Sequence, residues 1–227
     1  MNWPLVGLLL VAASACGPSG SRLMPVAEAR ADHDEHAAIA HDGGVTVVVE
    51  ATPWPGDAFI SERVFPLRVT VSNLCDRPVT VRYRDFELVS EHRRYPALPP
   101  FDIGGTVPTI DPRPDIVHPT VEHEGFAIAD RYEPFYPGIR SYNGPFSYDH
   151  DYHATYFPHW QDREVLPTPE MIAAALPEGV VEPKGYVTGW LYFGGTVGEH
   201  RRVTLQASLG SPDDRRVARL VIPFERE

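Results

Sequence analysis

Apolar and polar residues alternate strictly over residues 65–72, with Phe65, Leu67, Val69 and Val71 on one side of the pattern. The same odd-numbered phase returns over residues 79–83, after a segment that contains Asn73, Asp76 and Pro78. A period of two predicts strands with one buried face, and short polar side chains with a proline predict a turn. We therefore expect a hairpin over residues 65–89, around which the rest of the sheet is organised.

The apolar phase reverses near Arg84 and Asp85, because the next apolar residues are Phe86 and Leu88. A slip of one residue moves every side chain of a strand to its other face. Either a β-bulge absorbs the slip or the strand ends at this point. The pattern by itself leaves both alternatives open.

Further strands are predicted over residues 45–51, 93–98, 185–193, 202–209 and 217–224. Residues 168–176 predict a short helix, because Thr168 suits the N-cap, Pro169 the first helical position and Glu170 the positive end of the helix dipole. The same patterns place Val69, Trp190, Leu205 and Leu220 in the core.

The strand, turn and strand that lead to Asp85-Phe86-Glu87-Leu88 resemble Ig-like domains of small secreted bacterial proteins. The resemblance covers about half of the mature chain. It implies a mainly β fold, an antiparallel Ig-like sandwich of about seven strands, over residues 45–227. Such domains carry many unrelated functions, so the resemblance indicates architecture and names no role.

The N-terminal 15 residues carry no charged side chain, and an apolar run leads into Ala13-Ser14-Ala15-Cys16. This segment resembles a bacterial lipoprotein signal peptide, which implies cleavage after residue 15 and a lipid on Cys16. It departs from the pattern in having Ala where Leu is usual and no basic residue before the apolar run. Ordinary secretion is the alternative. We expect a protein anchored by lipid in the bacterial cell envelope, at the outer membrane where there is one.

Residues 17–44 show little apolar periodicity and end in two glycines, which predicts a flexible tether. The tether holds His33, His36 and His41 among acidic residues, and we interpret them as solvated. If Cys16 is acylated, Cys75 has no disulfide partner, and we interpret it as a small turn residue.

Residues 102–165 form a predicted insertion of different character, with eleven acidic residues against four arginines. It also contains five histidines and eleven aromatic residues: Phe126, Tyr132, Phe135, Tyr136, Tyr142, Phe146, Tyr148, Tyr152, Tyr156, Phe157 and Trp160. Aromatic residues are uncommon in disordered segments, so we expect an ordered insertion packed on the sandwich. The aromatic side chains are expected to form a small core of their own. The alternative is an exposed surface for a glycan or a protein.

The densest polar cluster of the insertion contains Asp149, His150, Asp151, His153 and His159. Carboxylate and imidazole groups together suit Zn²⁺ or another divalent ion. Hydrogen bonding within the loop explains the same residues without a metal, and it is the interpretation we prefer. We therefore expect no cofactor, with a divalent metal as the alternative.

No G-x-S-x-G, H-E-x-x-H, CxxC or phosphate-binding glycine motif occurs in the sequence, so nothing in it indicates an enzyme. The net charge of −11 argues against binding nucleic acid. We expect a non-catalytic, membrane-tethered module that contacts another envelope component, either protein or glycan. A metal-binding envelope protein is the second hypothesis, and the oligomeric state is left open.

Overall fold

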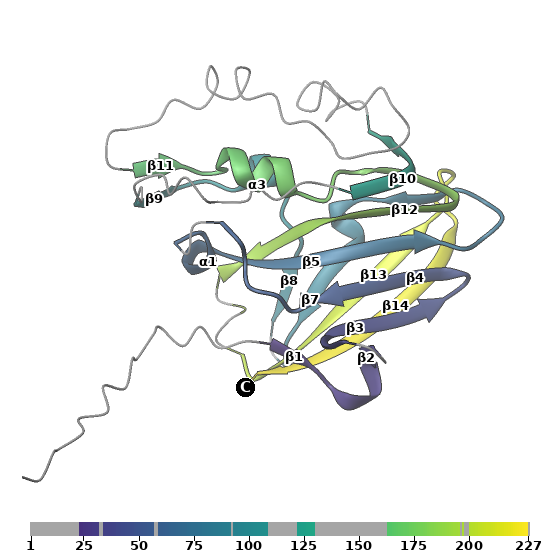
Figure 1. Ribbon diagram of the computed structural model, residues 1–227, viewed down its shortest axis with the longest axis horizontal. Coiled ribbons are helices and arrows are strands. Elements are labelled where there is room, and N and C mark those ends of the chain that lie inside the picture. The colour runs from purple at the N-terminus through teal and green to yellow at the C-terminus, as the bar shows by residue number, and fades with distance from the viewer. Residues whose placement is uncertain are drawn as a thin grey trace, which may run out of the picture.

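A computed structural model describes residues 23–31, 34–56, 59–91, 93–108, 122–129, 163–195, 197 and 200–226. The described chain is mainly antiparallel β structure, with a 12-stranded sheet and a separate two-stranded ribbon (Figure 1). The large sheet contains β1 (Leu23–Pro25), β2 (Arg30–Ala31), β3 (Asp34–Asp42), β4 (Val45–Glu50), β5 (Val64–Asn73), β6 (Val79–Val81), β7 (Phe86–Val89), β8 (Arg94–Pro96), β10 (Glu122–Ile128), β12 (Gly179–Gly194), β13 (Arg202–Gly210) and β14 (Arg216–Arg226). The ribbon pairs β9 (Thr106–Pro108) with β11 (Arg163–Val165).

Short helices connect these strands. The α-helices are α1 (Ile60–Arg63) and α3 (Pro169–Ala174), and the 3₁₀ turns are η1 (Ala27–Ala29), η2 (Tyr83–Asp85) and η3 (Pro100–Asp102). The predicted cap of α3 is confirmed, because the Thr168 hydroxyl accepts a hydrogen bond from the Met171 N–H at 3.2 Å. Helix α1 has no counterpart among the elements that the sequence predicts. A single turn with one buried residue, Ile60, leaves no helical period in the sequence.

Strand β12 is the element around which the sheet is built. It is 16 residues long and pairs with β5 over Tyr186–Gly194 and with β6 over Gly179–Val181. Strand β10 pairs with the same two parts of β12, with a register shift between Glu124 and Phe126. The sequence predicted only the part of β12 from residue 185 onward. The irregularity before it, where Lys184 has a φ of 67°, resembles a turn in the sequence.

The predicted hairpin over residues 65–89 is wrong in its pairing. Strands β5 and β6 both run antiparallel to β12 and are paired with it in succession. The intervening segment is held by Asn73, whose buried amide donates to the carbonyls of Arg77 and Val181 at 2.8 and 2.9 Å. Its amide oxygen accepts from the Cys75 N–H. Two strands in the same phase fit either arrangement, so the alternation could not distinguish them.

The reversal of phase near Arg84 is absorbed by η2, which separates β6 from β7. Tyr83, before the reversal, and Phe86, after it, are both buried. A 3₁₀ turn advances the chain with a different period from a strand. It therefore returns the apolar side of β7 to the same core. Of the two alternatives, the strand ends before the reversal and no bulge absorbs it.

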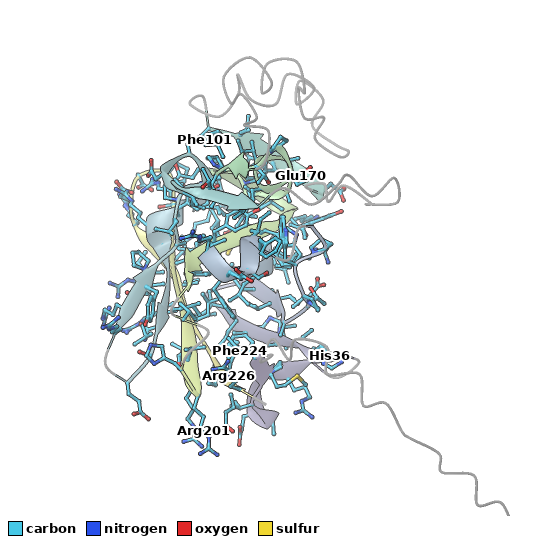
Figure 2. The ribbon with its side chains drawn as sticks, turned by 90° about the vertical axis from the view of Figure 1, so that its left-hand side faces the viewer. His36, Phe101, Glu170, Arg201, Phe224 and Arg226 are labelled. Carbon is cyan, nitrogen blue, oxygen red and sulfur yellow. The ribbon has the colours of Figure 1, made fainter. Side chains whose placement is uncertain are left out.

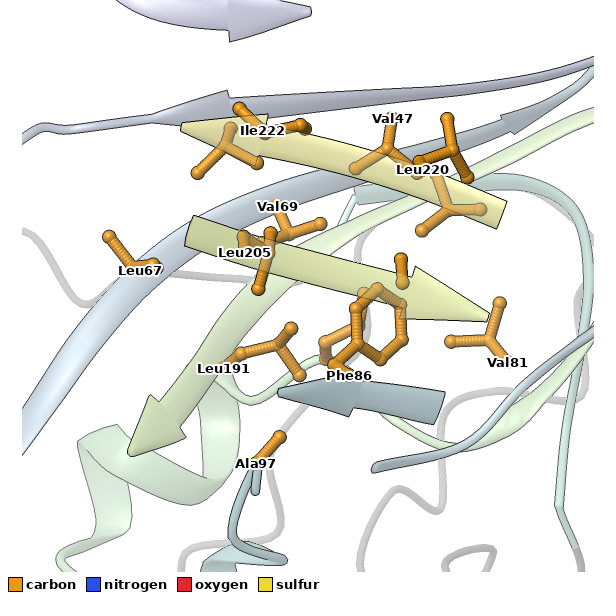
Figure 3. Packing of buried hydrophobic residues seen from close by; sticks show 14 of the residues in the cluster. Val47, Leu67, Val69, Val81, Phe86, Ala97, Leu191, Leu205, Leu220 and Ile222 are labelled. Carbon is orange, nitrogen blue, oxygen red and sulfur yellow. The ribbon is translucent and has the colours of Figure 1, made fainter. Parts of the chain in front are cut away.

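The main core lies between two halves of the large sheet that face each other (Figure 3). Val47, Val69 and Leu191 contribute from β4, β5 and β12, and they face Leu205 and Leu220 from β13 and β14. The predicted burial of Val69, Leu205 and Leu220 is confirmed, with exposures of 0%, 1% and 2%. Trp190 is also buried, but it lies in a second core on the outer face of β12.

The large sheet is nearly closed into a barrel, which differs from the expected sandwich of about seven strands. Its order runs β1-β14-β13-β6-β12-β5-β4-β3-β2, and the two end strands are joined by η1. Asp42 at the end of β3 accepts a hydrogen bond from the Arg219 N–H of β14 at 2.6 Å. Gly43 has a φ of 55°, and a Cβ there would lie 2.1 Å from the Val217 carbonyl oxygen. Glycine therefore permits the close approach at this seam.

The additional strands come partly from residues that were expected to be a flexible tether. Strands β1, β2 and β3 cover much of residues 23–42 and belong to the sheet. Ala37 and Ala38 of β3 are buried, and β3 pairs with β4 along six residues. Alanine side chains are small, so they give only a weak hydrophobic pattern. Pairing with β4 therefore stabilises a strand that the local sequence does not predict. The folded domain therefore begins before residue 45.

Candidate functional site

The residues that the sequence singled out for chemistry lie outside the described parts of the chain. This holds for Cys16 and for Asp149, His150, Asp151, His153 and His159. Within the described residues, no group of three or more His, Cys, Asp or Glu side chains is arranged to hold a metal ion. The metal hypothesis therefore stays a prediction.

Two of the three histidines in the predicted tether belong to β3. The His41 ring nitrogen Nδ1 lies 2.7 Å from the Thr46 hydroxyl, across the β3–β4 pair. His36 directly precedes the residues of β3 that pair with β4, and its carbonyl accepts a hydrogen bond from the Ala51 N–H. Both histidines thus take part in the sheet, while His33 lies outside the described residues.

The insertion is attached to the domain through a defined base. Strand β9 precedes residue 109 and β11 follows residue 162, and the two strands pair with each other, Pro108 opposite Arg163. Between them in sequence, β10 adds to β12 and places Phe126 in the main core with 1% exposure. Phe126 is therefore packed, but in the main core, and the small core expected for the insertion stays a prediction. The other ten aromatic residues of the insertion lie outside the described parts.

The base of the insertion packs against a second core. Trp54 packs edge-on against Trp190 and Tyr192 of β12, with ring centroids 5.0 and 5.8 Å apart. The Tyr192 hydroxyl donates to the Met171 carbonyl of α3 at 2.8 Å. Val107 of β9 is buried in the same cluster. The base of the insertion is therefore joined to β12 by packing as well as by chain connectivity.

The base of the insertion and strand β1 lie on opposite sides of the molecule. Strands β9, β10 and β11 with α3 lie at the top of Figure 1, and β1, β2 and the C-terminus lie at the bottom. The view turned by 90° agrees, with Phe101 and Glu170 at the top and Arg201 and Arg226 at the bottom (Figure 2). The domain therefore separates its N-terminal strand from the side that carries the insertion.

A cluster of charged residues surrounds η2. It includes Asp214, from the turn that joins β13 to β14. The Arg82 guanidinium donates to Asp214 at 2.5 Å, and Arg84 lies 3.5 Å from the same carboxylate. The Glu178 carboxylate accepts a hydrogen bond from the Tyr83 N–H at 2.9 Å. Burial raises the pKa of Asp85 to about 6, against the opposing effect of Arg82 and Arg84, which lower it.

We expect Asp85→Asn to stabilise the protein above pH 6. A carboxyl whose pKa is raised from 3.8 to about 6 contributes stability below 3.8 and loses it as the pH rises through 6. A difference of roughly two pH units corresponds to at most about 3 kcal/mol, and partial exposure reduces this to about 1–2 kcal/mol. Urea unfolding at pH 4 and pH 7.5 measures the effect, which should be much smaller at pH 4.

Asp214→Asn is the matched control for this prediction, because it should act with the opposite sign. The hydrogen bond from Arg82 lowers the pKa of Asp214, so its ionised form stabilises the fold above pH 3.8. This variant should therefore be less stable at pH 7.5. Equal stability of Asp85→Asn and the native protein at both pH values would contradict the assignment of Asp85.

Sequence reasoning did not find the charges around η2 or the arginines near β1, because each group comes from distant segments. None of the described helices is long and apolar enough to span a bilayer.

No protein-family model matches the chain. No curated protein matches it either. Among solved structures, it is similar to the crystal structure of a candidate lipoprotein (ycdA) from Bacillus subtilis subsp. subtilis str. 168, with 10% sequence identity and a TM-score of 0.35. The match covers 90% of this chain and 34% of that one, so the chain spans about a third of that protein's length. A likeness at this level assigns neither a family nor an activity.

Proposed function

We propose that this protein is a membrane-tethered, non-catalytic module of the bacterial cell envelope that presents its insertion to another envelope component. The observation that carries the proposal is the opposite placement of β1 and of the base of the insertion (Figures 1 and 2). An anchor that precedes β1 would leave the β9–β11 base directed away from the bilayer. A rigid β domain that carries a chemically distinct loop is a common way to build a binding site.

The proposed anchor is a lipid on Cys16, which would keep the domain close to its membrane. Because Leu23 already belongs to the sheet, only six residues separate it from Cys16. Such a segment spans at most about 25 Å when fully extended. The tether is thus much shorter than residues 17–44 suggest, and the partner must come to the domain near the membrane.

The fold is consistent with an elaborated Ig-like domain. Strands β4, β5 and the second half of β12 form one layer, and β7, β13 and β14 form the layer that faces it. Two facing antiparallel layers are the general arrangement of Ig-like sandwiches. We propose that β1, β2, β3 and β10 were added to that plan at its edges.

The proposal is tested by photo-crosslinking in intact cells from position 102, at the end of η3. Asp102 is exposed, and the adjacent Phe101 lies on the side that carries the insertion (Figure 2). We expect a discrete adduct with one envelope protein, or with glycan, when the photoreactive residue replaces Asp102. Mass spectrometry identifies the attached component, and the same residue at exposed position 77 should give no such adduct.

The same cells test the anchor. Cys16→Ser should move the protein from the membrane fraction to the soluble fraction and should weaken the adduct from position 102. Unchanged fractionation together with an unmodified mature N-terminus would exclude acylation. An adduct pattern that is identical from positions 102 and 77 would exclude the partner-facing role.

A further inference from the structure

We propose that the surface around β1 is a docking surface for anionic phospholipid headgroups of the membrane that holds the anchor. We call it the β1 surface, and it consists of Arg30, Arg201, Arg202 and Arg226 with the backbone of β1 and η1. This inference rests on the tethering proposed above and adds an orientation to it. The domain would lie against the bilayer on this side.

The arginines of the β1 surface are brought together by the pairing of β1 with β14. Leu23 of β1 lies opposite Arg226 of β14, and the Arg226 N–H donates to the Arg201 carbonyl at 2.8 Å. Arg30 and Arg226 line one open cavity of about 350 Å³, together with apolar Met24 and Val26. Figure 2 shows Arg201 and Arg226 at the lower end of the molecule. Three separate segments thus contribute arginines to this side of the molecule.

The charges of this surface are available to a ligand. Arg202 is paired with Glu225 at 2.8 Å. Arg30, Arg201 and Arg226 make no ion pair with any residue that the structure describes. The described side chains of this surface, four arginines against Glu28 and Glu225, carry a formal charge of +2, in a chain whose total is −11. The unpaired guanidiniums can form paired hydrogen bonds to phosphate oxygens.

The described part of the insertion, on the side opposite β1, is acidic. It holds Asp102, Glu122, Glu124 and Glu164 against Arg163, a formal charge of −3, and it is remote from β1 (Figure 1). Exposed charges are screened over about 8 Å at physiological ionic strength. An anionic bilayer therefore interacts with the nearby arginines far more than with the total charge, and it repels the side with the insertion. Both effects favour the same orientation.

The anchor keeps the β1 surface within reach of headgroups. The six residues between Cys16 and Leu23 allow a separation of at most about 25 Å and also allow direct contact. Each basic residue close to an anionic leaflet favours the docked state roughly fivefold. Three unpaired arginines therefore favour docking by a factor of about 100, which falls as the salt concentration rises.

Arginine footprinting on an artificial anchor tests the inference. A chain of residues 16–227 with Cys75→Ser is coupled through the Cys16 thiol to maleimide-bearing lipid, in vesicles of phosphatidylcholine with or without phosphatidylglycerol. Phenylglyoxal modification is then followed at each arginine by mass spectrometry. We expect Arg30, Arg201 and Arg226 to react at least about fivefold more slowly on the anionic vesicles, and to recover in high salt. Exposed Arg77, Arg216 and Arg219 should react equally on both.

Paired triple variants separate docking from general charge effects. Arg30→Gln/Arg201→Gln/Arg226→Gln should abolish the protection of Arg202 on anionic vesicles. Arg77→Gln/Arg216→Gln/Arg219→Gln changes the net charge equally and should retain it. The inference would be overturned if Arg30, Arg201 and Arg226 reacted equally on both kinds of vesicle. It would also be overturned if both triple variants lost the protection of Arg202 equally. Because the maleimide supplies the anchor, this result is independent of whether Cys16 is acylated in cells, which Cys16→Ser tests separately.

Discussion

Leu205→Ala is expected to destabilise the protein by about 2–5 kcal/mol, which corresponds to a fall in Tm of roughly 10 °C. Leu205 lies on β13 with 1% exposure, opposite Leu88 on one side and Ile222 on the other. Its side chain points into the space between the two halves of the sheet (Figure 3). Truncation removes apolar contacts and leaves a cavity that rigid β strands close only in part. Urea unfolding and thermal melting measure the loss.

Ser208→Ala on the same strand is the control for this prediction. Ser208 is exposed on the other face of β13, so its replacement should change the free energy of unfolding by less than about 0.5 kcal/mol. A similar loss at both positions would show that the faces of β13 are assigned incorrectly. Thr70 is a poorer control, because its hydroxyl is 2.8 Å from that of Thr188.

Gly189→Ala is expected to destabilise the protein by about 2–4 kcal/mol and to loosen the layer formed by α3. A Cβ at this position would lie 2.6 Å from the Leu176 Cα and 2.7 Å from its nitrogen. Both atoms belong to backbone, and the same Leu176 N–H donates to the Trp190 carbonyl at 2.9 Å. Relief of the clash therefore requires the segment after α3 to move and the hydrogen bond to break.

The expected loss of stability is local, so it should affect the packing of the second core before that of the main core. Near-UV circular dichroism should decrease, because Trp54 and Trp190 pack together under α3. Far-UV circular dichroism should change little below the melting temperature. Gly104→Ala is the matched control, since a Cβ there meets no atom within 4 Å. Equal stability of Gly189→Ala and Gly104→Ala would contradict the close packing of α3 on β12.

The sequence by itself determined the elements whose signal is local. The alternation in residues 65–72 and 202–209 identified β5 and β13 and the inward faces of both, because successive side chains of a strand point to opposite sides. Thr168 and Pro169 located the start of α3, because they satisfy the first free N–H groups and the first helical φ within a few residues. None of these conclusions needed a distant partner.

Only the tertiary structure decided which segments meet. Strands β5 and β6 keep one phase whether they pair with each other or with β12, so their true partner was hidden. Strand β3 has few large apolar residues and forms because β4 offers it a complementary edge. Trp190 is buried outside the main core because α3 covers the outer face of β12. The β1 surface unites Arg30 with Arg201 and Arg226, which are far apart in sequence. Which strands pair, which face of β12 is covered and which charges lie together all depend on contacts between residues remote in sequence. A periodic pattern within one segment carries no information about such contacts.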